Sequence, residues 1–299
     1  MTAPPDGDPH DAAIERVIDA RARELAGLSV RRVLPALHRR TVGPFIFLDH
    51  MGTHAIAPGG GVDVPPHPHI GLATVTYLYE GELVHRDSLG SQQPIRPGDV
   101  NWMTAGRGVV HSERTAADQR AAGGRLHGLQ LWVALPIAHE DAAPTFHHHP
   151  ARTLPELELD GVRVRVLAGA AHGVTSPIAT LSPLAYVDAT LPAGAALPVE
   201  RTHAERAVYV VDGEVTCAGT AAGPGRLLVL APGAEVVVRA VTPARLALLA
   251  GAPLDGPRLI DWNFVASSRA RIEQARADWR DRRFPLVPGD EHDFVPLPR

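Results

Sequence analysis

From about residue 44 to residue 250 the chain consists of short apolar runs separated by turn residues. In the segment 126–136, apolar residues at every second position alternate with Gln130 and Trp132, which is typical of a strand with one face in a core. Glycine and proline, 28 of each, punctuate these runs along the whole chain. The pattern predicts an all-β protein.

Several segments allow more specific predictions. Segment 74–88 alternates on both sides of Glu80-Gly81-Glu82, which predicts a hairpin. Segment 227–241 predicts two strands around a Pro-Gly turn. Segment 14–25 spaces its apolar residues as a helix does, although a strand also fits. We expect the polar residues 1–12 to be disordered.

The character of the chain changes after residue 260. Ser267 or Ser268 can cap a helix in which Ile272, Ala275 and Trp279 share one face. A Phe-Pro pair ends this predicted helix, and a polar, proline-rich tail follows.

Two short segments recur at nearly the same offset. Tyr77–Leu83 matches Tyr209–Val215, and Arg96–Val100 matches Ala231–Val236. Such turns are also common in unrelated β proteins, but two matches at nearly equal offsets favour a β-unit used twice. The boundary between the two units would fall in the polar stretch 147–156.

Composition narrows the possible functions. The chain has 299 residues with 45% hydrophobic and 21% charged positions, enough to build a buried core. The net charge is −4 and every basic residue is arginine, which argues against direct binding to nucleic acid and removes Schiff-base chemistry. The single Cys217 excludes a disulfide framework within the chain and a four-cysteine zinc site, and we expect it to be a small buried residue.

The sequence predicts no association with a membrane. No apolar run approaches the roughly 18 residues that a membrane span requires. The first residues are polar and acidic and have no apolar segment of the kind found in secretory signals. We therefore expect a cytoplasmic protein.

The histidines suggest a metal site. His67 and His69 are two residues apart, as are His111 and Glu113, so on strands each pair points to one face. Two such strands facing each other in a barrel would bring three imidazoles and one carboxylate together, a donor set that suits a divalent first-row metal. Pro68, between the first two histidines, fits only an edge strand or a bulge.

The spacing of these residues resembles the cupin motifs, and longer segments strongly resemble the pirin family. The frame from Gly61 through His67 and His69 to Gly81 follows the first cupin motif. The segments that resemble pirins are 42–52, 64–115, 127–136 and 262–298. The resemblance implies two cupin (jelly-roll-type) β-barrels packed face to face, with a short C-terminal helix.

The same resemblance implies where the metal binds. By position, the pirin ligands fall on His67, His69, His111 and Glu113, and the metal would be one divalent ion, Fe(II) first, with Mn, Ni, Cu or Zn as alternatives. The implied domains are residues 13–148, which bind the metal, and residues 149–299, a second cupin without metal that ends in the helix and the tail.

Two further sets of residues qualify this assignment. Many pirins have Arg and Glu where this chain has Ile70 and Ala73, which leaves the surroundings of the ligands open. In the second unit the frame from Gly194 to Gly213 carries Glu200 and Thr202 in place of histidines, so we predict a structural barrel. Residues whose role the sequence leaves open are Asp49, His50, His54, His85 and Asp87, the run His147–His149, and the pair His203 and Glu205.

Resemblance also implies an activity. Some pirins cleave the flavonol quercetin with O2 in a 2,3-dioxygenase reaction, for which Glu113 would be both ligand and catalytic base. Trp102, Met103 and Trp132 are the candidates for a planar aromatic pocket, although strand tryptophans also serve as core.

Two other interpretations remain open at this stage. Other pirins resemble non-enzymatic, iron-dependent redox sensors that bind a transcription factor or a metabolic enzyme. The substrate could also be a different enol or catechol. We expect a small aromatic substrate and O2 as partners, with a protein partner allowed, and a monomeric chain.

Overall fold

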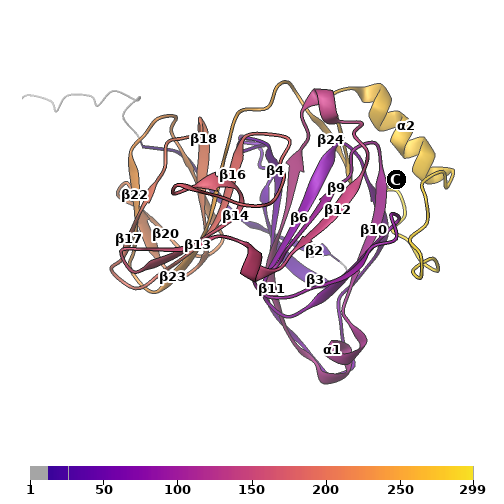
Figure 1. The fold of residues 1–299 in the computed structure, drawn as a ribbon, viewed down its shortest axis with the longest axis horizontal. Helices are drawn as coiled ribbons and strands as arrows, with labels where there is room; N and C mark the ends of the chain where they lie inside the picture. The colour runs from indigo at the N-terminus through magenta and orange to yellow at the C-terminus, as the bar shows by residue number, and fades with distance from the viewer. Residues whose placement is uncertain (1–12, 26, 299) are drawn as a thin grey trace, which may run out of the picture.

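The computed structural model describes residues 13–25 and 27–298, and the predicted disorder of residues 1–12 lies outside this range. Two β-barrels pack side by side, as the sequence predicted, with one helix, α2 (Arg269–Arg280), on the outside of the first (Figure 1). No helix in the described part of the chain has the length and apolar character needed to cross a membrane.

The first barrel is built from one large and one small antiparallel sheet. The large sheet runs in the order β12 (Thr145–His149), β9 (Val100–Thr104), β6 (Leu72–Glu80), β11 (Gly124–Ala134), β4 (Phe45–Ile56), β3 (Leu28–Leu34) and β2 (Arg21–Leu25). The small sheet runs in the order β5 (Asp63–His69), β10 (Val109–Arg114), β7 (Leu83–Asp87) and β8 (Gln92–Ile95). A short helix, α1 (Ala117–Ala122), lies between β10 and β11.

The second barrel repeats this plan. Its large sheet runs in the order β1 (Ile14–Asp19), β21 (Arg226–Leu230), β18 (Glu205–Asp212), β23 (Ala244–Gly251), β16 (Leu184–Leu191), β14 (Val162–Ala171) and β13 (Glu156–Leu159), with β15 (Val174–Thr175) paired to β14. Its small sheet runs in the order β17 (Ala196–Val199), β22 (Val236–Ala240), β19 (Val215–Cys217) and β20 (Thr220–Ala222). Cys217 is buried, as expected.

The predicted hairpin over 74–88 is wrong. Its two strands form, as β6 and β7, but β6 pairs with β9 and β11 in the large sheet while β7 pairs with β8 and β10 in the small one. Gly81, at φ 85°, turns the chain from one sheet to the other. A side chain there would come within 2.3 Å of the Arg125 carbonyl oxygen, so the sharp turn requires glycine.

The two barrels confirm the predicted repeat, but the sequence comparison aligned one of the two pairs of segments incorrectly. Gly81 and Gly213 are equivalent, since each follows a large-sheet strand and precedes a small-sheet strand. The counterpart of Gly98 is Gly225 rather than Gly233. Gly98 donates its N–H to Leu78 and Gly225 donates its N–H to Val210, each at 2.9 Å, at the same point in the two barrels.

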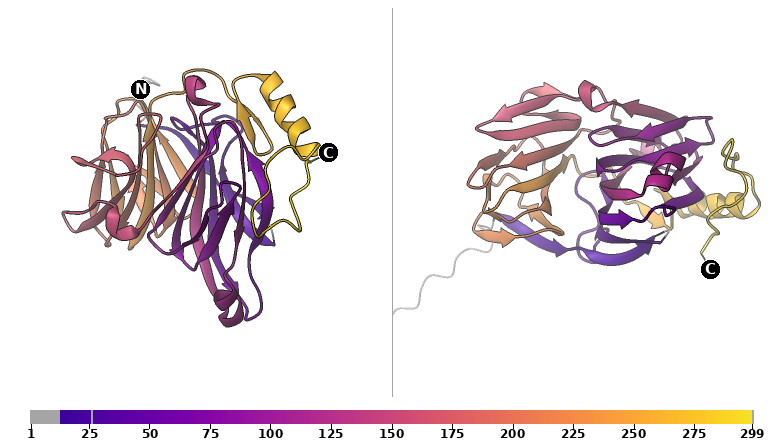
Figure 2. Two further views of the ribbon diagram at one scale, coloured as in Figure 1. Left: turned by 45° about the vertical axis from the view of Figure 1, so that its right-hand side comes forward. Right: turned by 90° about the horizontal axis from the view of Figure 1, so that it is seen from below.

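Segment 14–25 forms strands, which was the alternative to the helix that its apolar spacing also allowed. β1 pairs with β21 of the second barrel, and β2 continues the chain into the large sheet of the first. The first described residues therefore run along both barrels (Figure 2). Pairing with two sheets provides backbone hydrogen bonds that override the weak helical pattern.

The C-terminal segment, which the sequence analysis assigned to the second domain, packs against the first barrel. β24 (Leu259–Asp261) and β25 (Phe264–Ala266) form a small hairpin, and α2 follows, capped by Ser268 as predicted. The buried Ile272 and Ala275 of α2 pack against Ile70 and Phe264, so this segment covers the first barrel (Figure 2).

The two large sheets face each other across a continuous apolar core. Leu129, Leu131 and Val133 from β11 lie in one cluster with Tyr209 and Leu249 of the second barrel. These three residues occupy the face of β11 that the alternating pattern assigned to the core. Because this one apolar cluster contains residues of both barrels, the two barrels share a core.

We expect Leu131→Ala to reduce the free energy of unfolding by about 2–5 kcal/mol, because Leu131 has no exposed surface and its removal leaves a cavity between the barrels. Urea denaturation measures this loss. Leu37→Ala is the matched control, since Leu37 is 83% exposed and its truncation should change little. Equal stability of the two variants would contradict a shared core.

Candidate metal centre

The predicted ligands lie on two neighbouring strands of the small sheet. β5 carries His67 and His69, β10 carries His111 and Glu113, and the antiparallel pairing sets His111 opposite His67. A bulge between His111 and Glu113 shifts the register. β5 is the edge strand of its sheet, which explains how it accommodates Pro68.

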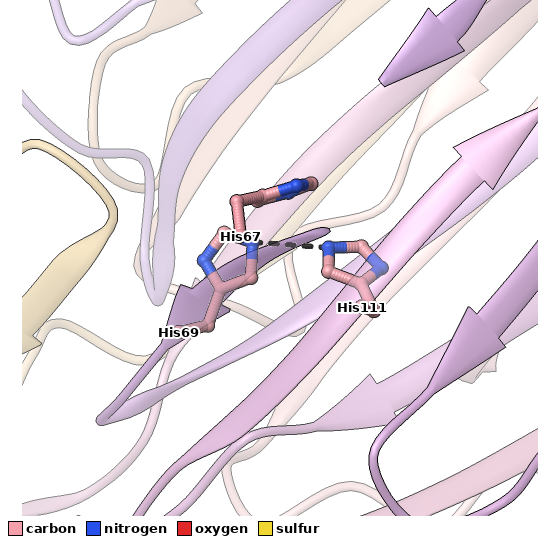
Figure 3. A group of neighbouring side chains, drawn as sticks. All are labelled: His67, His69 and His111. Atoms are coloured by element: carbon pink, nitrogen blue, oxygen red, sulfur yellow. Dashed lines mark hydrogen bonds between the residues drawn. The ribbon is translucent and has the colours of Figure 1, made fainter. Parts of the chain in front are cut away.

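The three histidines converge inside the barrel. Each offers a ring nitrogen, and the three nitrogens lie within 4.8 Å of one another. The Nε2 atoms of His69 and His111 are 3.1 Å apart, and the ring of His67 lies over both (Figure 3). All three side chains are buried, and no other group of this kind occurs among the described residues.

Outer partners orient two of these rings. His67 Nδ1 lies 2.9 Å from the carbonyl oxygen of Pro65, and His69 Nδ1 lies 3.2 Å from that of Asn263. A carbonyl only accepts, so each Nδ1 carries the proton and donates it. In a neutral ring the inward Nε2 then keeps its lone pair, which is the form that binds a metal.

Burial keeps these rings neutral. Loss of solvation lowers the pKa of His67 to about 4, and it lowers the pKa values of His69 and His111 well below their usual range. The neighbouring imidazoles lower the pKa values of all three rings further. Three neutral, inward-facing imidazoles fit one divalent transition-metal ion, and the hard cations Ca²⁺ and Mg²⁺ fit poorly.

Glu113 lies beside the three histidines without joining them. Its carboxylate accepts a 3.1 Å hydrogen bond from the Thr76 hydroxyl and is not one of the mutually close groups. Burial raises the pKa of Glu113, while His85 and the Thr76 hydrogen bond partly offset that rise. A carboxylate with a raised pKa is a stronger base than a solvated one.

The histidines and Glu113 open onto a cavity of about 470 Å³. Phe47 and Trp132 stack in its wall with ring centroids 4.1 Å apart, and Trp132 meets His69 edge-on at 5.2 Å. Arg32 donates two hydrogen bonds to Asp49, at 2.8 and 2.7 Å, and its guanidinium lies over the Phe47 ring. Further lining residues are Glu24, Pro35, Val64, Gln130, Ile260, Trp262, Asn263 and Val295.

Of the three predicted pocket residues, only Trp132 lines the cavity. Trp102 points the other way, into the core between the barrels, because it shares a strand face with Val100. Met103 packs behind Trp132 in the barrel interior without lining the cavity. The placement of Trp102 and Met103 in the pocket is therefore corrected.

Neither departure from the usual pirin sequence places a side chain in the histidine cluster, although Ile70 directly follows His69. Ile70 packs beneath α2, and Ala73 faces the core between the barrels. His54 bonds the Ser29 carbonyl at the surface, and His148 bonds Asn101. None of these residues belongs to the metal cluster.

His50 and Glu205 serve contacts between the barrels. His50 Nδ1 lies 2.7 Å from the Tyr209 hydroxyl. Glu205 accepts a hydrogen bond from the Gly43 N–H and pairs with Arg39. Among the described residues of the second barrel no three-ligand group occurs.

Some residues of the site could not be picked out from the sequence. Asn263 follows His69 by 194 residues and contributes only a backbone oxygen, for which no side-chain signal exists. Phe47 and Arg32 come from neighbouring strands of the large sheet. Phe47 lies in an unbroken apolar run and Arg32 follows another arginine, so no pattern in the sequence marks either residue as cavity wall.

Comparison with known proteins identifies the relatives of this fold and site. The family model "Pirin" matches residues 27–133, and "Pirin C-terminal cupin domain" matches residues 186–285. The chain belongs to the pirin family. A pirin-like protein of Caulobacter vibrioides is 50% identical and covers 95% of this chain and 99% of its own length.

Solved structures of similar proteins have the same architecture. The crystal structure of quercetin 2,3-dioxygenase from Acinetobacter baumannii superposes with a TM-score of 0.89 at 34% identity, covering 95% of both chains. The pirin YhhW from Escherichia coli, solved in complex with nickel(II), superposes with a TM-score of 0.63 at 17% identity and covers 80% of this chain and 99% of its own. Both barrels of the 299-residue chain are therefore cupin barrels.

We expect the metal-free protein to lose stability as the pH falls below 6.5. The unfolded chain protonates its histidines at the ordinary pKa of 6.5, whereas folded His67 resists protonation down to about pH 4. Each such histidine should lower the free energy of unfolding by up to about 1.4 kcal/mol per pH unit in this window. Urea denaturation between about pH 7.5 and pH 5 measures the slope.

A shallower slope is expected for His67→Gln, because this substitution removes one buried titrating group. The exposed His147 provides the control, and His147→Gln should retain the slope of the unsubstituted protein. An equal slope in both variants would show that burial does not keep His67 neutral.

Proposed function

We propose that this pirin is a metal-dependent dioxygenase that uses O2 to cleave a flavonol or a related enol or catechol. The observation that carries the proposal is the set of three buried, neutral imidazoles opening onto an aromatic-walled cavity. Its volume of about 470 Å³ falls within the range of small-molecule sites. The similarity to a structure named quercetin 2,3-dioxygenase supports the substrate class.

His67, His69 and His111 would hold one divalent ion, with Glu113 as the fourth ligand. The ion, which we propose to be Fe(II), would supply Lewis acidity and electron exchange with O2 and substrate. A nitrogen-rich ligand set accepts several first-row metals, and the nickel bound in the Escherichia coli pirin agrees with that range.

Glu113 would accept the proton of the substrate hydroxyl group. The Thr76 hydroxyl holds its carboxylate next to the imidazoles but outside their cluster. A carboxylate in this position can alternate between the ligand position and the Thr76 hydrogen bond, so that it is free to take a proton when the substrate oxygen enters. No other carboxylate among the lining residues lies next to the histidines on β5 and β10.

The cavity wall would orient a flat substrate. The stacked faces of Phe47 and Trp132 offer apolar contact to a planar ring system beside His69. Arg32, whose guanidinium is held by Asp49, supplies donors and positive charge on the same wall. Together these groups favour a planar ligand with electron-rich oxygen atoms.

We expect His69→Ala to lose most of the metal that copurifies with the protein, because one of three imidazole donors is removed. Elemental analysis after purification without added metal measures the content. His147→Ala, in an exposed histidine of β12 outside the cluster, is the matched control. Equal metal content in the two variants would rule out the assigned ligands.

Glu113→Gln should reduce turnover by roughly 10²–10⁴-fold, the usual contribution of a general base, while the three histidines keep much of the metal. Oxygen uptake by iron-loaded protein with quercetin, other flavonols and catechols measures turnover. Glu80→Gln makes the same chemical change at the surface of β6 and should have no effect.

Two results would contradict the dioxygenase proposal. One is full turnover by metal-loaded Glu113→Gln. The other is no O2 consumption by the iron-loaded unsubstituted protein with any compound of the panel. The second result would leave the metal site in place and direct attention to an iron-dependent binding function.

A further inference from the structure

Behind His111 lies a chain of buried polar groups that the proposed reaction does not use. His111 Nδ1 is 3.4 Å from Nδ1 of His85, and His85 Nε2 is 2.9 Å from Oδ2 of Asp87. His85 is 3% exposed and Asp87 is fully buried. The His85 ring also stacks on Phe146, with centroids 4.2 Å apart and planes 10° from parallel.

We infer that Asp87 and His85 are positioning residues that determine which nitrogen of His111 carries the proton. The carboxylate of Asp87 accepts, so His85 holds its proton at Nε2. A His85 ring with a single proton, at Nε2, accepts at Nδ1, and His111 donates its Nδ1 proton to it. The His111 Nε2, which lies 3.1 Å from Nε2 of His69, then holds a lone pair for the metal in place of the proton that the two rings could otherwise share.

The direction of this chain is fixed at Asp87. Its other oxygen, Oδ1, accepts hydrogen bonds from the backbone N–H groups of Leu89 at 2.9 Å and Ser91 at 3.0 Å. Oδ1 is thus held by the turn after β7, and only Oδ2 faces His85. The two ends of the carboxylate are not interchangeable.

Because of this asymmetry, the substitution Asp87→Asn should reverse the direction of the hydrogen bonds that run from residue 87 through His85 to His111. The amide oxygen must take the Oδ1 position, because an NH2 group cannot accept from the two backbone N–H groups. The NH2 group then faces His85 and donates to its Nε2. His85 becomes protonated at Nδ1 and donates to His111, so the proton of His111 moves to Nε2 and blocks the metal-binding lone pair.

The inference rests on the metal-binding part of the proposed function. A merely structural role for Asp87 makes a different prediction. Asn has nearly the same shape and size as Asp, so packing alone would leave the three imidazoles where they are and the metal affinity unchanged. The affinity and spectrum of the bound metal therefore separate the two roles.

Competition between the protein and a chelator for Co(II) gives the metal affinity, and the visible spectrum of bound Co(II) reports its ligands. We expect Asp87→Asn to weaken binding by about 10–100-fold and to change the spectrum. Asp188→Asn is the matched control, because Asp188 is also a buried carboxylate but lies on β16 of the second barrel, outside the histidine cluster. It bonds Tyr77 and Arg245. This variant should bind Co(II) like the unsubstituted protein.

An Asp87→Asn protein that is folded and binds Co(II) within about threefold of the unsubstituted protein, with the same spectrum, would overturn the inference. A failure of the unsubstituted protein itself to bind Co(II) would instead contradict the proposed function.

Nitrogen NMR of the metal-free, unsubstituted protein with ¹⁵N-labelled histidine provides a second test that needs no variant to fold. The inference requires His85 protonated at Nε2 and His111 protonated at Nδ1. Observation of His85 protonated at Nδ1, or of His111 protonated at Nε2, would overturn it whatever the metal experiments give.

Discussion

The histidine cluster of the candidate metal centre depends on the register in which β5 pairs with β10. This register sets His111 opposite His67, and the two-residue period of a strand then places His69 on the same face. A slip of one residue would turn both imidazoles of β5 away from the cavity. On its other side β10 pairs with β7, where His111 lies opposite Asp87, so the same register also brings the residues behind His111 into place.

The register alone does not orient His69, which requires the C-terminal hairpin. The turn between β24 and β25 brings the Asn263 carbonyl to His69 Nδ1. The hairpin can approach only because residue 71 is glycine, since a side chain there would lie 2.0 Å from the Val265 oxygen and φ is 67°. A segment that follows the second barrel in sequence therefore completes a site in the first.

Local periodicity paired His67 with His69 and His111 with Glu113, because i and i+2 positions share a strand face, but the convergence of the two pairs on one metal rested on the resemblance to the pirin family. Sheet membership was harder, since alternation in β6 and β7 does not reveal that the turn at Gly81 joins two sheets. The prediction that Trp102 points into the pocket was wrong for a related reason. Both faces of β9 are buried, one in the barrel and one between the barrels, so hydrophobicity could not distinguish them.

The arrangement of the three rings is itself an argument for a bound cation. Carbonyl partners place the protons of His67 and His69 on their outward nitrogens. The Nε2 atoms of His69 and His111 lie 3.1 Å apart, close enough for the two rings to share a proton or a metal ion. A divalent ion would accept the inward lone pairs of all three rings at once, and an ion that binds only the folded chain would also stabilise the fold.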